Sequence, residues 1–390
     1  MKKLLSILLL VLFIGINQTH INASLDKYIN AMGTTIVVEL YDQGTEEDYL
    51  KIKEIFEYYD YLGSNYIRKD SPYQDLNNVY IINEQRNKAP VLVNDDLFEL
   101  ISFSIDMMQQ TNGYFNPLIG EAVDIWKNVI ETYEKSEITE AIYNQTKSAL
   151  EAIPSINASD IILDRENKTI LLTGNAKLDL GAVAKGYATQ KAVEYIQSKG
   201  IKMYQIDAGK SSLAYGTHPQ NRPFNVGLND PLGLYEPVDG HLVYAIIKVK
   251  DKHVVTSGDS LQYVTYQGKT LHHILDPHDY MPKNYYHTIT IQGLDGAQLD
   301  AYSTAVFNMP EDVAIEFLEG QGLNYSFYKT SGITHNYKEN DISLSKPKKT
   351  YNSLLILVLI LSSVILVFGS VIAVMMIKEK KQKDEQKTAH

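Results

Sequence analysis

The chain has 390 residues, with 47 acidic against 36 basic side chains and a formal net charge of −11. This balance argues against a nucleic-acid partner, because proteins that bind nucleic acid present a basic surface. The absence of cysteine excludes disulfides, thiolate metal sites and a lipid anchor on a cysteine.

The N-terminal residues have the pattern of a secretory signal. Two lysines precede an apolar run over residues 4–14, and small residues follow it. We expect residues 1–23 to be a signal peptide cleaved near Ala23, because the apolar run is short for a membrane span. A permanent N-terminal anchor is the alternative.

The region after the signal is long enough for one large domain or two lobes. Apolar spacing predicts a helix over 46–62, and Asn94 is the expected N-cap of a second helix that ends before Gly113. A hairpin over 161–174 is expected to turn at Glu166 and Asn167. Strands are predicted over 31–40, 244–250, 253–258, 261–275 and 287–293, and a last helix over 299–309. Because helices and strands do not alternate regularly, the predicted fold class is α+β.

Residues 354–377 form an apolar run without a charge, long enough to cross about 30 Å of hydrocarbon. We expect a transmembrane helix over 353–377; a buried core helix is the alternative. The signal peptide would send the preceding chain outward and make this span a stop-transfer segment. The expected arrangement is an extracytoplasmic domain, a juxtamembrane linker over 336–352, a single-pass anchor in the cell membrane and a cytoplasmic tail over 378–390.

The stretch LDLGAVAKGYATQKAVEYI, residues 178–196, predicts a short strand that turns at Gly181 into a helix with Lys185 in its first turns. The unpaired N–H groups and the dipole of a helix N-terminus attract anions, so a phosphate is the expected ligand. Asp179 beside this terminus indicates that the ligand has a further polar group.

Asp300 and Thr304 are four residues apart in the last predicted helix, so their side-chain oxygens share one face. Two interpretations are open from the residues alone. Asp300 is a helix cap, or the two oxygens bind Mg²⁺, which takes few protein ligands and keeps positions for water and phosphate.

The segment TLHHILDPHDYMP contains His272, His273, Asp276 and His278. Neighbouring strand residues face opposite sides, so His272 and His273 cannot line one pocket and a three-histidine metal site is disfavoured. One histidine as a general base is the functional alternative to purely structural histidines. The Gly- and Ser-rich turns within 206–216 and 254–260 can cradle phosphate, but they are equally typical of surface hairpins.

Taken in chain order, these stretches resemble the ApbE family of FAD:protein FMN transferases. The resemblance rests on AMGTT, SNYIRKDSPYQDLN, NGYFNPLIGEAVDIW, LDLGAVAKGYATQKAVEYI, IDAGKSSLAYG, VVTSGD, HHILDP and LDAYSTAVF. It covers about residues 28–335. It implies an ApbE-like domain of mixed and antiparallel sheets with packed helices.

The resemblance also implies a reaction. FAD is bound with Mg²⁺, its pyrophosphate is cleaved, and FMN is transferred to a threonine or serine hydroxyl of a target protein with release of AMP. Some relatives hydrolyse FAD to FMN and AMP, so an FAD pyrophosphatase is one alternative. A surface flavin-binding protein without catalysis is another.

The residue roles implied by the resemblance divide between metal and substrate. Asp300 and Thr304 would supply oxygens to Mg²⁺ together with the carbonyl of Ala182. Ser303 would be a weaker ligand, at a position where some relatives have another aspartate. His273 is the candidate base for the acceptor hydroxyl.

Lys185 is the second candidate catalytic residue and would contact FAD near its phosphates, while Asp179 would hydrogen-bond a polar edge of FAD. The other positions that match the flavin or adenine pocket are Met32, Tyr66, Tyr114, Phe115, Asn116 and Leu275.

The chain departs from the family pattern at three places. Lys210 and Ser211 stand where relatives carry glycine and aspartate, Asn116 replaces an aspartate, and residues 278–280 replace a Thr-Gly turn. The chain also lacks the Gly-Ala-Thr or Gly-Ala-Ser of the family's acceptor signature. The expected acceptor is therefore a separate exported or membrane protein, such as a component of an electron-transfer system.

Overall fold

The computed structural model describes residues 25–41 and 44–348 and the two isolated positions Phe368 and Met375. The predicted signal peptide, the tail over 378–390 and, apart from those two positions, the span over 353–377 lie outside the described residues. Within the described part of the chain, no helix has the length and apolar character to cross a membrane.

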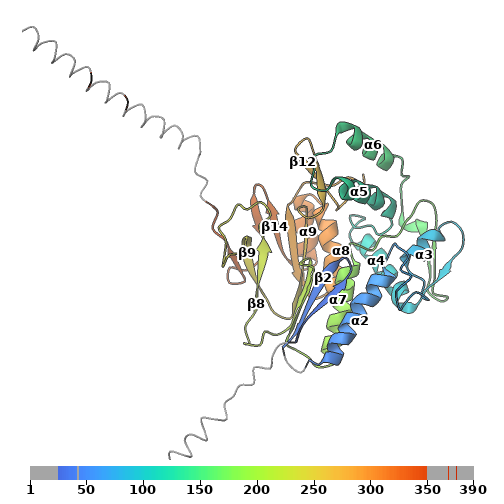
Figure 1. Ribbon diagram of the computed structural model, residues 1–390, viewed down its shortest axis with the longest axis horizontal. Helices are drawn as coiled ribbons and strands as arrows, with labels where there is room; N and C mark the ends of the chain where they lie inside the picture. Colours follow the sequence, from blue (N-terminus) through green and yellow to red (C-terminus); the bar gives the residue numbers. More distant parts are fainter. Residues whose placement is uncertain (1–24, 42–43, 349–367, 369–374, 376–390) are drawn as a thin grey trace, which may run out of the picture.

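The centre of the fold is an eight-stranded sheet in which all neighbouring strands are antiparallel. Its order is β1 (Leu25–Ala31), β2 (Thr34–Leu40), β6 (Tyr204–Ala208), β7 (Ser212–Tyr215), β10 (Lys252–Gly258), β13 (Thr288–Gly293), β14 (Asn324–Lys329) and β15 (Gly332–His335). Helices α2 (Glu46–Leu62), α7 (Ala184–Ser198) and α8 (Gly296–Phe307) cover one face of this sheet (Figure 1).

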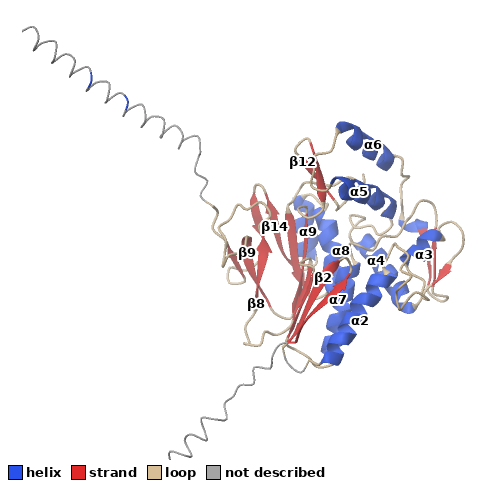
Figure 2. Cartoon of the chain, in the orientation of Figure 1, coloured by secondary structure: helices blue, strands red, loops and turns tan. Residues whose placement is uncertain are grey.

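A three-stranded sheet covers the opposite face (Figure 2). Its order is β16 (Ile342–Leu344), β9 (Val243–Val249) and β8 (Phe224–Asn229). Alternation along the strands of the large sheet separates two apolar cores, because successive side chains point to opposite faces. Val255 and Phe327 belong to the core under the helices, whereas Val254 and Tyr328 pack against the small sheet.

The remaining elements extend the helical side. A small sheet has the order β3 (Val91–Leu92), β5 (Thr169–Leu172), β4 (Ile161–Asp164), and a separate hairpin is formed by β11 (Tyr263–Tyr266) and β12 (Lys269–His272). The helices are α3 (Val79–Glu84), α4 (Asp95–Gln110), α5 (Gly120–Tyr133), α6 (Glu140–Glu151) and α9 (Glu311–Gly320), with a short 3₁₀ turn over Ala158–Asp160.

The predicted α+β class is confirmed, and so are several local predictions. The first predicted helix has the bounds of α2, and Asn94 caps α4 by accepting a hydrogen bond from the Leu97 N–H. The hairpin over 161–174 is formed by β4 and β5. Within the described residues, parallel pairing occurs only at isolated bridges, such as Ile119 with Lys177. All strand ladders of the described residues are antiparallel, so the expectation of mixed sheets is wrong.

The strand predicted over 31–40 is confirmed from Thr34 to Leu40 as β2, but its first residues belong to a turn. The strand predicted over 261–275 is wrong because it is a hairpin. The chain reverses between β1 and β2 at Met32 and Gly33, whose φ angles are 55° and 70°. It reverses between β11 and β12 at Gln267 and Gly268, with φ angles of 50° and 73°. Two consecutive positive φ angles are typical of the tight turns that join antiparallel strands. The short strand expected before Gly181 is also absent from the described sheets.

Candidate active site

The site is built where the start of α7 meets α8. The backbone N–H of Gly186 donates a 2.7 Å hydrogen bond to Oδ2 of Asp300. A Cβ on Gly186 would lie 2.4 Å from both the Cβ of Asp300 and the carbonyl oxygen of Gly296. Only glycine therefore allows the two helices to approach this closely. Sequence-distant motifs are brought together by this contact.

Asp300 is not the cap of α8. Asp295 is the N-cap, and its side chain accepts hydrogen bonds from the backbone of Ala297 and Gln298. Asp300 lies one turn further along the helix and is only 7% exposed. The capping interpretation of Asp300 is therefore wrong, and its burial needs another explanation.

The surroundings of Asp300 suit a cation. Burial raises the pKa of this carboxyl group, whereas the charge of Lys185 and the Gly186 N–H lower it. Only Oδ2 accepts a hydrogen bond from the described residues. A buried carboxylate with so few partners is stabilised when a positive charge binds beside it. Asp300 thus fits a Mg²⁺ ligand, although no three histidine, aspartate or glutamate side chains of the described residues are placed so that they could hold a metal ion together.

The hydroxyl groups of Ser303 and Thr304 differ in availability. Ser303 Oγ donates to the carbonyl oxygen of Asp300 at 3.0 Å and lies 2.8 Å from Ser257 Oγ. Thr304 is half-buried, and its hydroxyl has no hydrogen-bond partner in the described part of the chain. Thr304 is therefore better placed than Ser303 to bind a ligand. Ala182 is half-buried in the turn before α7.

The two adjacent histidines lie in different surroundings, as expected for neighbouring residues at a strand end. The buried His272 places its Nε2 2.8 Å from the carbonyl oxygen of Lys283. His273 is exposed, and partial desolvation together with the charges of His272 and Lys185 lowers its pKa to about 4. His273 is therefore neutral near pH 7.

A second group lies around Asp179. Its Oδ1 accepts a 2.8 Å hydrogen bond from the Gly181 N–H, and its Oδ2 accepts one of 3.0 Å from Asn65. Burial raises the pKa of Asp179, while the Gly181 N–H lowers it and Asp124 raises it further. The carboxylate is thus oriented by the turn that leads into α7.

Tyr66 is held from α5 by a residue that sequence reasoning missed. The ammonium group of Lys127 donates to the Tyr66 hydroxyl and lies 4.8 Å from the centre of its ring. The hydrogen bond to Tyr66 raises the pKa of Lys127, burial lowers it, and the negative charge of Asp179 raises it further. Asp179, Tyr66 and Lys127 therefore belong to one neighbourhood. The only sequence signal for Lys127 is its position directly after the DIW stretch.

The remaining predicted positions are spread around the helical side. Met32 is half-buried in the β1–β2 turn, and the Tyr114 ring lies 4.8 Å from that of His278. The side chains of Phe115 and Leu275 are buried in the core. Asn116 is half-buried, and its Oδ1 accepts a hydrogen bond from the Leu118 N–H.

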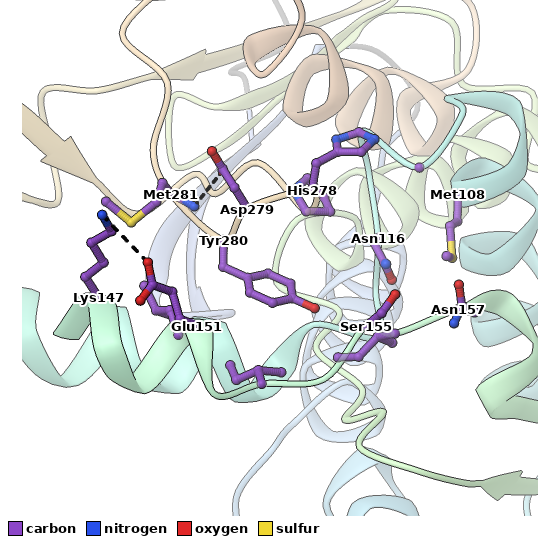
Figure 3. A pocket seen from close by; sticks show the side chains of 15 residues that line it. Met108, Asn116, Lys147, Glu151, Ser155, Asn157, His278, Asp279, Tyr280 and Met281 are labelled. Atoms are coloured by element: carbon purple, nitrogen blue, oxygen red, sulfur yellow. Dashed lines mark hydrogen bonds and ion pairs between the residues drawn. The ribbon is translucent and has the colours of Figure 1, made fainter. Parts of the chain in front are cut away.

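A hollow of about 630 Å³ lies beside the site, not on it (Figure 3). Asn116 is the one predicted site residue in its wall, and His278, the ring partner of Tyr114, is another wall residue. Lys147 and Glu151 of α6 line another part of the wall. The hollow adjoins the predicted site through Asn116, but it contains neither Asp300 nor Lys185.

The family model of the ApbE family matches residues 32–327. A Treponema pallidum protein named FAD:protein FMN transferase is 27% identical over 245 residues, which are 58% of this chain and 63% of that relative. A Klebsiella pneumoniae protein of the same name is 25% identical over 320 residues, 82% of this chain and 90% of that relative.

Solved structures share the fold. The ApbE protein from Thermotoga maritima aligns with a TM-score of 0.67 and 23% identity, over 81% of this chain and 97% of that one. The flavin transferase ApbE from Vibrio cholerae aligns with a TM-score of 0.63 and 19% identity over the same shares. With the family model matching most of the described residues, the chain belongs to the ApbE family.

Proposed function

We propose that this chain transfers FMN from FAD to a threonine or serine hydroxyl of a separate protein and releases AMP. The names of its curated relatives support flavin transfer. The observation that carries the proposal is the Gly186–Asp300 hydrogen bond, which joins the lysine-bearing start of α7 to a buried carboxylate on α8. Phosphoryl transfer needs such a pairing of a cationic site with an anchored metal ligand.

Asp300 and Thr304 would hold Mg²⁺, with the carbonyl of Ala182 as a further oxygen ligand. When bound, the metal supplies positive charge to the pyrophosphate of FAD. Lys185 adds a second positive charge near the phosphates. Ser303, whose hydroxyl is hydrogen-bonded to the hydroxyl of Ser257, would position the helix turn that carries Asp300.

His273 would act on the acceptor. In its neutral form it accepts the proton of the acceptor hydroxyl, whose oxygen forms a bond to the phosphorus of the FMN half. The bond from that phosphorus to the bridging oxygen of FAD breaks, and AMP leaves. Asp179, oriented by Gly181 and Asn65, would bind a polar edge of FAD.

We propose that the reaction takes place on the outer face of the cell membrane. The apolar segment over 353–377 would anchor the chain, residues 1–23 would direct its export, and residues 378–390 would remain in the cytoplasm. The acceptor would then be an exported or membrane protein, such as a component of an electron-transfer system.

The test uses the full chain with FAD, MgCl₂ and a peptide that carries the family's acceptor signature. Equal amounts of AMP and FMN-labelled peptide are expected, and EDTA should abolish both. Free FMN with AMP and no labelled peptide would instead indicate an FAD pyrophosphatase. FAD binding without any AMP would indicate a non-catalytic flavin-binding protein.

A further inference from the structure

Four exposed leucines belong to the loop between β8 and β9 and to the end of β16, which pairs with β9. Their exposed fractions are 39% for Leu232, 42% for Leu234, 50% for Leu242 and 51% for Leu344. We call this set the leucine patch. Single exposed leucines are ordinary on protein surfaces, whereas a local group of them marks an interaction site. The patch is distinct from the candidate active site.

The loop between β8 and β9 that carries three of these leucines is firmly held. The backbone N–H of Asp230 donates to the carbonyl oxygen of Leu242 at 3.0 Å and closes the loop at its base. The buried Asp230 carboxylate accepts hydrogen bonds from the Tyr235 N–H at 2.8 Å and from the Tyr328 hydroxyl at 2.6 Å. The leucines are therefore presented by an ordered loop.

The same loop binds the last described stretch of the chain. The Lys348 N–H donates to the carbonyl oxygen of Leu234 at 2.8 Å, and its ammonium group donates to that of Gly233 at 2.7 Å. The Glu236 N–H donates to the carbonyl oxygen of Lys346 at 2.8 Å. Leu344 precedes this stretch at the end of β16. The loop that carries most of the patch is thus bound to the stretch from which the chain continues toward residue 354.

Distance along the chain ties the patch to the predicted membrane span. Five residues lie between Lys348 and Leu354, where the apolar run begins, and the six steps from one to the other reach at most about 20 Å. We propose that the leucine patch rests in the interface of the lipid bilayer and fixes the orientation of the outer domain. This inference rests on the proposed membrane anchoring.

The charges beside the patch indicate which lipid property matters. Lys346 and Lys348 are exposed, but Glu236 and Asp239 are exposed on the same loop and offset them. Contact of the leucine side chains with the lipid interface therefore drives binding of the outer domain to the bilayer, and attraction to anionic headgroups does not. The face should bind bilayers of zwitterionic phosphatidylcholine as well as bilayers that contain an anionic lipid.

The absence of native cysteine allows a clean test. The full chain is reconstituted in phosphatidylcholine vesicles as Leu234→Cys or Leu344→Cys, each labelled with an environment-sensitive fluorophore. Leu50→Cys is the matched control, because Leu50 is 53% exposed and belongs to α2, which lies on the other side of the large sheet from β8 and β9 (Figure 1). Nitroxide lipids should quench the two patch positions about threefold more strongly than the control.

Equal quenching at all three positions would overturn the proposal. A second copy of the chain or a protein partner on the patch would keep lipid away and give that same result. Flotation of the labelled chain with vesicles separates this failure from failure of the anchor. A chain that floats without selective quenching refutes only the patch, whereas a chain that does not float refutes the anchor and the patch together. Both outcomes leave the flavin-transfer assay unaffected.

Discussion

Ser257 and Ser303 share a 2.8 Å hydrogen bond between their side-chain oxygens, which joins the end of β10 to α8. Because Ser303 also donates to the backbone carbonyl of Asp300, its single O–H is already engaged inside the protein. The next residue, Thr304, keeps its hydroxyl free of partners among the described residues. Two adjacent hydroxyl groups on one helix are therefore expected to differ in function.

Thr304→Val removes this free oxygen and keeps the shape of the side chain. If Thr304 binds Mg²⁺, AMP release at limiting Mg²⁺ should fall at least about tenfold, which corresponds to roughly 1.4 kcal/mol. A titration of AMP release against Mg²⁺ concentration measures the effect. Ser303→Ala is the matched control; it should lower the free energy of unfolding by about 1 kcal/mol and leave the Mg²⁺ requirement nearly unchanged. If Ser303→Ala raised the Mg²⁺ requirement and Thr304→Val did not, the metal ligand would be Ser303 and not Thr304.

Gly186→Ala tests the close approach of α7 and α8. The new methyl group would meet Asp300 and the Gly296 backbone at 2.4 Å, so we expect a loss of about 1–3 kcal/mol in the free energy of unfolding. Flavin transfer should fall as well, because Asp300 must move. Urea unfolding and AMP release measure the two effects.

Gly320→Ala is the control for this substitution. Gly320 ends α9, and a Cβ there would meet no atom within 4 Å. Alanine should therefore leave activity unchanged and raise the free energy of unfolding by about 0.5 kcal/mol. Equal destabilisation by both substitutions would contradict the packing argument.

His273→Gln and His272→Gln separate chemistry from structure. The first should lower transfer to the acceptor with little change in Tm, because His273 is exposed. The second should lower Tm, because the buried His272 contacts the Lys283 carbonyl. Since the pKa of His273 is lowered to about 4, this base stays neutral from pH 8 to pH 5 and transfer should not fall through its protonation in that interval. A decline with a midpoint near pH 6.5 that is absent in His273→Gln would contradict this.

Local signals explain why some elements could be predicted from the sequence. Helix α2 has an apolar stripe and a Thr45 cap within its own residues, and Asn94 caps α4 in the same way. The hairpin at Met32 was missed because apolar residues alternate on both sides of it, and a non-glycine residue with positive φ is uncommon. Strand ladders depend on partners elsewhere in the chain, so the mixed sheets were predicted wrongly.

The site was predictable only through its motifs. Gly186 and Asp300 are 114 residues apart, and neither spacing nor periodicity reveals their hydrogen bond. The resemblance implied that Lys185 and Asp300 lie near one substrate, and the structure adds the reason why position 186 must be glycine. Lys127 was missed because its role depends on Tyr66, which lies 61 residues away.

His253 makes stability depend on pH. It is 3% exposed, its Nδ1 has no partner in the described part of the chain, and burial lowers its pKa to about 4. The unfolded chain binds a proton here near pH 6.5, whereas the folded chain does not until about pH 4. The neutral ring is therefore fully compatible with folding above pH 6.5, and stability is lost as the pH falls toward 4. The expected loss from this residue between pH 7 and pH 5 is about 2 kcal/mol.

Urea unfolding at the two pH values measures this loss, and His253→Leu isolates it. Leucine has no titratable group, so the decrease in the free energy of unfolding between pH 7 and pH 5 should be smaller in the variant by about 2 kcal/mol. Other titrating groups contribute equally to both chains and cancel in the difference. If His253→Leu and the parent chain lose the same free energy, the ring is protonated in the folded state and His253 does not control acid stability.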